Sequence, residues 1–129
     1  MFTDDYVRLS RPTYYLNVDI AGPATAEAFV AFSAEHTINT DSQKVSWSSD
    51  GTTTKIGNAD QNVLGSKGDR VNIDWGYLHV LPTDGASAWA GSLSTAQSSF
   101  TSSGALPAKP DTRMPRAVSD DLPGAVSRR

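Results

Sequence analysis

Alternation of apolar and polar residues predicts a chain built mainly of β-strands. Leu16, Val18 and Ile20 alternate with two polar residues, which indicates a half-buried strand over Thr13–Ile20. Four further segments carry β-branched and aromatic residues between turn signals and are also predicted to be strands: Thr25–Glu35, Gln43–Ser48, Thr52–Gly57 and Arg70–Leu81. A helix competes for the first of these, because alanine is frequent there. Ser49-Asp50-Gly51 is a turn of the Asp-Gly hairpin type.

The last predicted strand divides its side chains between two faces. Trp75, Tyr77 and His79 share one face with Val71 and Ile73, and Leu78 and Val80 lie on the other. Large aromatic residues supply much of the burial in a small sandwich. We therefore expect Trp75 and Tyr77 to fill the core.

The pattern changes after the strands. Residues 94–103 are predicted to form a short helix, with Ser92 or Ser94 as N-cap, Gly104 just beyond its end and an apolar stripe of Leu93, Ala96 and Phe100. From residue 107 onward, prolines are frequent and apolar periodicity is lost. The prediction is a mainly β, antiparallel and partial β-sandwich of about five strands at 1–106, followed by a Pro-rich irregular tail at 107–129.

Composition narrows the classes of function. The 129-residue chain has a formal net charge of −3, so it lacks the basic surface of a nucleic-acid-binding protein and any polybasic run for an anionic membrane. No apolar run approaches the ~20 residues of a membrane span. The absence of cysteine excludes disulfides and thiolate metal sites. The first ten residues also lack the basic and apolar regions of a signal peptide.

Candidate catalytic and metal-binding residues are few. His36 and His79 are too far apart in sequence to give the usual ligand spacing of a zinc site, so we expect a loop residue and a strand residue. No G-x-S-x-G motif is present, and Gly65-Ser66-Lys67-Gly68 lacks the rest of a phosphate-binding loop. The carboxylates to be considered for acid–base chemistry, of which Asp74 and Glu35 would serve a small glycosidase-like hydrolase, are Glu27, Glu35, Asp60, Asp69 and Asp74.

Aromatic residues offer an alternative function. Trp47, Tyr77 and Trp89 would suit a free-standing carbohydrate-binding module if they formed an exposed row. The residues assign no catalytic, cofactor-binding or metal-binding position, and no cofactor is expected.

An ordered set of short motifs resembles the β-sandwich region of the glutaminase A family. The matching residues, in family order, are Leu9-Ser10-Arg11-Pro12, Glu27–Glu35, Gly57, Asp60-Gln61, Leu64, Gly68-Asp69, Ile73-Asp74-Trp75-Gly76-Tyr77, Phe100, Gly104-Ala105-Leu106-Pro107, Pro115-Arg116, Asp120-Asp121 and Pro123. The likeness covers roughly residues 3–123.

The resemblance implies an accessory domain that precedes a helical toroid domain, which is the expected partner and is absent from this chain. The whole protein of that family hydrolyses L-glutamine to glutamate and ammonia, usually outside the cell. No catalytic residue of the family maps onto these positions. The resemblance also leads us to expect a truncated fragment with missing strands, whose open strand edges would favour self-association.

Overall fold

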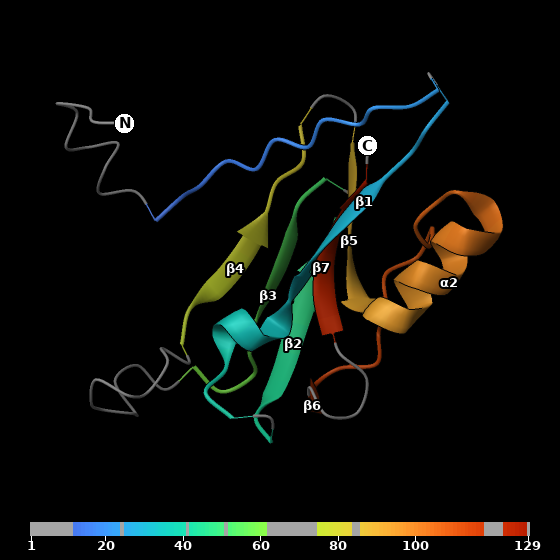
Figure 1. Ribbon diagram of the computed structural model, residues 1–129. Coiled ribbons are helices and arrows are strands. Elements are labelled where there is room, and N and C mark those ends of the chain that lie inside the picture. The colour runs from blue at the N-terminus through green and yellow to red at the C-terminus, as the bar shows by residue number, and fades with distance from the viewer. Residues whose placement is uncertain are drawn as a thin grey trace, which may run out of the picture.

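The computed structural model describes residues 12–23, 25–40, 42–50, 52–61, 75–83, 86–117 and 123–128. These residues form two antiparallel sheets (Figure 1). The predicted mainly β, antiparallel sandwich with one short helix is therefore confirmed. Seven strands are present in the described residues, against the five predicted.

One sheet has four strands in the order β4-β3-β2-β6. Strands β2 (Lys44–Ser49) and β3 (Thr54–Asn58) form the predicted Asp-Gly hairpin, in which Ser49 pairs with Thr54. The Asp50 carboxylate accepts hydrogen bonds from the backbone N–H groups of Thr52 and Thr53, at 2.8 and 2.7 Å. These bonds close the turn and, with that of Thr53 as the largest cause, lower the pKa of Asp50. Strand β4 (Tyr77–Val80) and the two-residue β6 (Arg116–Ala117) form the edges.

The other sheet has three strands in the order β1-β7-β5. Strand β1 (Phe29–Ser33) runs directly into the 3₁₀ turn η1 (Ala34–Thr37), so only part of the predicted strand Thr25–Glu35 is in a sheet. Strand β5 (Ser87–Ser92) is at the opposite edge. The central strand β7 (Pro123–Arg128) pairs with both neighbours.

The structure therefore corrects the prediction of a wholly irregular tail over 107–129. Two of the seven strands lie in that range, and β7 is the middle of a sheet. Its sequence begins Pro-Gly-Ala and has little β-propensity of its own. Pairing on both sides determines its conformation, and its proline stands at the first position of the strand, where a missing N–H is tolerated.

The hydrophobic core lies between the two sheets. Paired residues of an antiparallel sheet point to the same side, and the side facing the core carries Val45, Trp47, Ile56 and Val80. Ala90 and the half-buried Phe32 meet them from the three-stranded sheet, and Ala34 and Ile38 of the η1 region complete this cluster.

The predicted helix is confirmed as α2 (Leu93–Ser103), a third layer that packs on the outer face of the three-stranded sheet (Figure 1). Ser92 is the N-cap, since its hydroxyl accepts a hydrogen bond from the backbone N–H of Thr95, and Gly104 ends the helix with a φ of 67°. Ala96 is buried against Trp89, and the ring of Phe100 contacts that of Phe29 edge-on at 4.9 Å.

The segment Thr13–Ile20 is not a strand in the described structure. It runs outside both sheets, as the blue trace in Figure 1 shows. Its alternating side chains are exposed, Tyr15 to 90% and Leu16 to 57%. The prediction was wrong because alternation indicates only that a segment suits a half-buried strand, whereas a strand also needs a neighbour.

We predict that Gly91→Ala lowers the free energy of unfolding by more than about 2 kcal/mol, because overpacking of this kind forces backbone shifts. A Cβ at Gly91 would lie 2.5 Å from the Cβ of Asp111 and 2.5 Å from the Trp89 ring, and the φ of 154° also favours glycine. Gly22→Ala is the matched control, since its added Cβ would meet only Ala26 at 3.6 Å. Urea denaturation followed by tryptophan fluorescence compares the two. Equal stability of both variants would contradict the close approach at Gly91.

Candidate functional site

The carboxylates considered for acid–base chemistry do not converge. Glu27, Glu35 and Asp60 are all exposed and belong to different parts of the fold. Asp69 and Asp74 lie outside the described residues, as does the segment Gly65–Gly68. Across the described ranges, no group of three or more His, Cys, Asp and Glu side chains is placed to hold a metal ion.

Both histidines have local structural contacts. Nδ1 of His36 lies 2.9 Å from the backbone carbonyl of Ser33, within the η1 turn. His79 is exposed on β4, where its ring stands edge-on to Tyr77 with a centroid distance of 6.4 Å. The two histidines therefore lie in a turn and a strand, respectively.

The aromatic residues that fill the core are not the expected ones. Trp47 and Trp89 are buried, each with 4% of its surface exposed, whereas Trp75 is 38% and Tyr77 47% exposed. The expectation that Trp75 and Tyr77 fill the core was wrong, because β4 turns Leu78 and Val80 inward. An exposed sugar-binding row of Trp47, Tyr77 and Trp89 is not formed.

Tyr77 lies on the outer surface of the four-stranded sheet. Its register partner is Gly57, and a Cβ at that position would clash with the ring carbon Cδ1, so glycine makes room for the ring over β3. The ammonium group of Lys55 lies 3.6 Å from the ring centroid, a cation–π contact. This outer surface combines an aromatic ring with a positive charge.

Gln61 connects the loop after β3 to Gly76 through its side-chain amide. The side chain of Gln61 donates to the carbonyls of Asn58 and Gly76, at 2.7 and 3.1 Å, and accepts from the backbone N–H of Gly76 at 2.6 Å. These three bonds join the end of β3 to the start of β4. Gln61 therefore holds two strand ends together, and both polar atoms of its side chain take part in these bonds.

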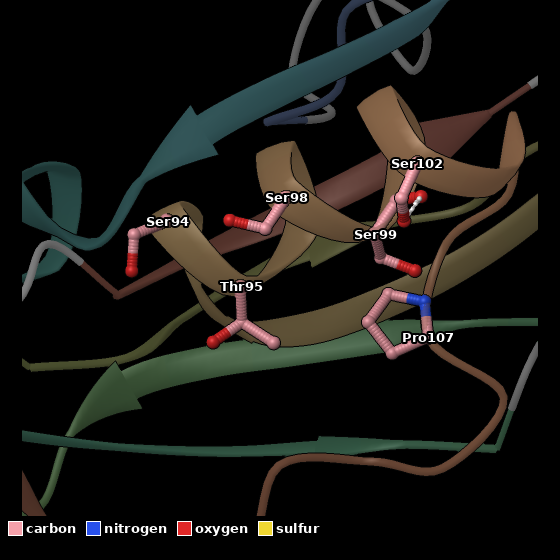
Figure 2. A pocket seen from close by; sticks show the side chains of 6 residues that line it. All are labelled: Ser94, Thr95, Ser98, Ser99, Ser102 and Pro107. Carbon is pink, nitrogen blue, oxygen red and sulfur yellow. Dashed lines mark hydrogen bonds between the residues drawn. The ribbon is translucent and has the colours of Figure 1, made fainter.

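Two depressions lie on the described surface, and most of the residues that line them are polar. One, of about 460 Å³, lies along α2 and is lined by Ser94, Thr95, Ser98, Ser99, Ser102 and Pro107. Figure 2 shows their hydroxyl groups along one side of the helix beside Pro107, without a charged group among them. The other, of about 510 Å³, is lined by Ser42, Gln43, Lys44, Asn58, Ala59 and Asp60. Neither encloses a pair of carboxylates.

The most constrained carboxylate is that of Asp111, in the Pro-rich segment that follows α2. Only 5% of its side chain is exposed. Oδ1 accepts from the backbone N–H and Nε of Arg113, at 2.9 and 3.0 Å, and Oδ2 accepts from Nη2 of Arg113 at 2.7 Å. Oδ2 also accepts from the backbone N–H of Ser92 at 3.3 Å. Asp111 therefore binds the junction between β5 and α2.

The backbone around Asp111 accepts hydrogen bonds from both buried tryptophans. The indole Nε1 of Trp47 donates to the carbonyl of Asp111, and that of Trp89 to the carbonyl of Lys109, both at 2.8 Å. A buried indole N–H needs such a partner. We call residues 106–114, with these contacts, the strap.

The chemistry of Asp111 is that of a structural anion. The side-chain hydrogen bonds from Arg113 lower its pKa from 3.8 to about 2, aided by the backbone N–H groups of Arg113 and Ser92 and opposed by burial. A carboxylate that is so strongly held in its ionised form is a poor general acid or base near neutral pH.

Sequence reasoning missed Asp111 altogether. It lies in Pro-Asp-Thr-Arg, between prolines and without apolar periodicity. The one local signal is an arginine two residues after an aspartate, a pattern that is too common to indicate a buried ion pair.

The chain matches the family model described as Domain of unknown function (DUF5127) over residues 1–126. It therefore belongs to this family. No curated protein and no solved structure matches the chain. Among the described residues, no helix has the length and the apolar character needed to cross a bilayer.

We predict that Asp111→Asn lowers stability at neutral pH by up to about 2 kcal/mol, the value of a pKa shift of this size. The folded-state pKa lies below that of the unfolded chain, so the contribution is present above pH 4 and is lost as the pH falls from about 4 to 2. The difference between wild type and variant should therefore close across that window.

Denaturation curves at several pH values measure this difference. Asp60→Asn is the control, because Asp60 is exposed and its substitution should leave stability unchanged. A wild-type–variant difference that persists at pH 2 would contradict the role of the ionised carboxylate.

Proposed function

We propose that this chain is a non-catalytic β-sandwich module of a glutaminase A-like protein. Its task would be to support a helical catalytic domain that the chain does not contain. The resemblance of ordered motifs over residues 3–123 motivates the parent activity, hydrolysis of L-glutamine to glutamate and ammonia.

The observation that carries the non-catalytic role is the scattering of ionisable side chains. Amide hydrolysis requires a nucleophile or activated water, a proton carrier and groups that stabilise an oxyanion, all within a few ångströms of one another. The described carboxylates and histidines do not gather at one site, and the hydrogen bonds of His36 and Asp50 stay within their own turns. Asp111 is the exception, and Arg113 and the Ser92 N–H occupy its oxygens.

The surface is consistent with a supporting role. Both depressions are open, and hydroxyl or amide side chains form part of each lining. The outer face of the four-stranded sheet exposes Tyr77 beside Lys55, a combination of ring and charge that suits contact with another protein surface. A free-standing carbohydrate-binding module is less well supported, since Trp47 and Trp89 are buried.

We predict that the purified chain releases no ammonia from L-glutamine above the uncatalysed rate. The parent polypeptide, with its helical domain, should be active under the same conditions, in a coupled assay that measures both ammonia and glutamate. Removing the module from the parent should lower the thermal stability of the helical domain. The module alone turning over glutamine would refute the proposal, and a parent that is inactive on glutamine would refute the choice of family.

A further inference from the structure

The N-terminal extended segment (residues 12–20) has the form of a β-strand without a sheet. Tyr14, Leu16, Val18 and Ile20 alternate with Thr13, Tyr15, Asn17 and Asp19, so an extended backbone places four apolar side chains on one face. All four are exposed, Tyr14 to 66% and Val18 to 43%. Single exposed apolar residues need no explanation, but an ordered row of them marks a surface for contact.

The same chain offers an edge that such a strand would fit. Within the described parts of the chain, β4 is the outermost strand of the four-stranded sheet and pairs on one side only, with β3. An unpaired edge is a template for strand addition, in which backbone hydrogen bonds hold the added strand. Leu78 and Val80 turn inward on β4, and Leu81 just beyond them is 67% exposed. A strand beside β4 would extend the inward side, which Leu78 and Val80 form, with Leu16, Val18 and Ile20.

The charges on the two polar faces are complementary. With its apolar residues turned inward, the segment would place Asp19 on the outer surface of the sheet. There Tyr77 and His79 are exposed on β4, and Lys55 stands opposite His79 on β3. In a register that sets Asp19 opposite His79, the acidic residue lies beside the imidazole, with Lys55 on the next strand beyond, and cross-strand pairs of acidic and basic residues stabilise a sheet.

We propose that the N-terminal extended segment of one copy adds to strand β4 of a second copy, and that the exchange is reciprocal. Ala21-Gly22-Pro23 joins the segment to the sandwich, and the Pro23 carbonyl accepts a turn hydrogen bond from Ala26 at 2.8 Å, which marks the hinge. Reciprocal exchange gives a closed twofold dimer in which the β4 edge of each copy is covered.

The area available is of the size that a stable dimer needs. Each aromatic side chain contributes roughly 150–250 Å² when buried, and each copy supplies two tyrosines and three aliphatic residues in this segment. In a reciprocal exchange each copy also supplies an acceptor edge, which adds further area to that copy. The sum approaches the ~800 Å² per partner of a standard interface. This inference does not rest on the proposed function, since the dimer needs no helical domain.

Sedimentation velocity over a hundredfold range of concentration provides the first test. We expect a species of twice the 13.7 kDa chain mass. Leu16→Glu should weaken the dimer at least tenfold, because it places a charge on the apolar face. Asn17→Glu adds the same charge to the opposite face and should leave the dimer intact. Fluorescence of the buried Trp47 and Trp89 verifies that every variant is folded.

A charge exchange tests the predicted neighbours. Asp19→Lys should weaken association, and Asp19→Lys combined with Lys55→Glu should restore it. A wild-type chain that stays monomeric overturns the proposal. The same result would be expected if the segment paired only with another part of a longer polypeptide. A Leu16→Glu variant as dimeric as wild type also overturns it.

Cross-linking locates the contact. The chain has no natural cysteine, so only the introduced cysteines can form a disulfide. Tyr15→Cys, Asn17→Cys or Asp19→Cys is mixed with a His79→Cys chain and oxidised. At least one pair should give a disulfide between different chains, whereas Ser98→Cys on α2 should give none with His79→Cys. Cross-linking within a single chain that carries both cysteines, or no cross-link from any pair, would show that β4 of a second copy is not the acceptor.

Discussion

The contact of Asp111 with the junction between β5 and α2 is the constraint on which the rest of the fold depends. One carboxylate binds the Ser92 N–H and the guanidinium of Arg113, and the Cβ of the same aspartate lies close to Gly91. The strap around it accepts the indole N–H groups of Trp47 and Trp89. Trp47 belongs to one sheet and Trp89 to the other, so a segment without regular structure ties the two sheets together. It also returns the chain to the positions of β6 and β7.

This arrangement explains how a chain with few large aliphatic residues forms two layers. Buried indoles contribute large apolar areas, but each also brings a polar N–H that costs free energy if it lacks a partner. The strap supplies both partners from backbone carbonyls, at 2.8 Å each. Ala88, Ala90 and Gly91 of β5 leave room beside the rings. The small residues of β5 are therefore needed for the tryptophan rings to be buried.

The surface carries the features that point beyond the single chain. Among the described residues the ionisable groups are dispersed, and the proposed supporting role rests on this dispersal. Its apolar surplus is concentrated instead in residues 12–20 and beside β4, where Leu81 and Tyr77 are exposed. In the proposed dimer of this DUF5127-family chain, the backbone groups at the described β4 edge would bond to the added strand.

The sequence alone determined the elements whose signals are local. Alternation and an Asp-Gly turn defined the β2–β3 hairpin, and Ser92, the Leu93–Phe100 spacing and Gly104 defined α2. Tertiary structure decided everything that depends on a distant partner. β7 is a strand because β1 and β5 lie on both sides of it, whereas Thr13–Ile20, with the better pattern, lies outside the described sheets. The inward face of β4 and the burial of Asp111 likewise depend on contacts with residues elsewhere in the chain. Periodicity reports which residues suit a two-sided environment, but hydrogen bonds and packing across the chain decide which side is covered and by what.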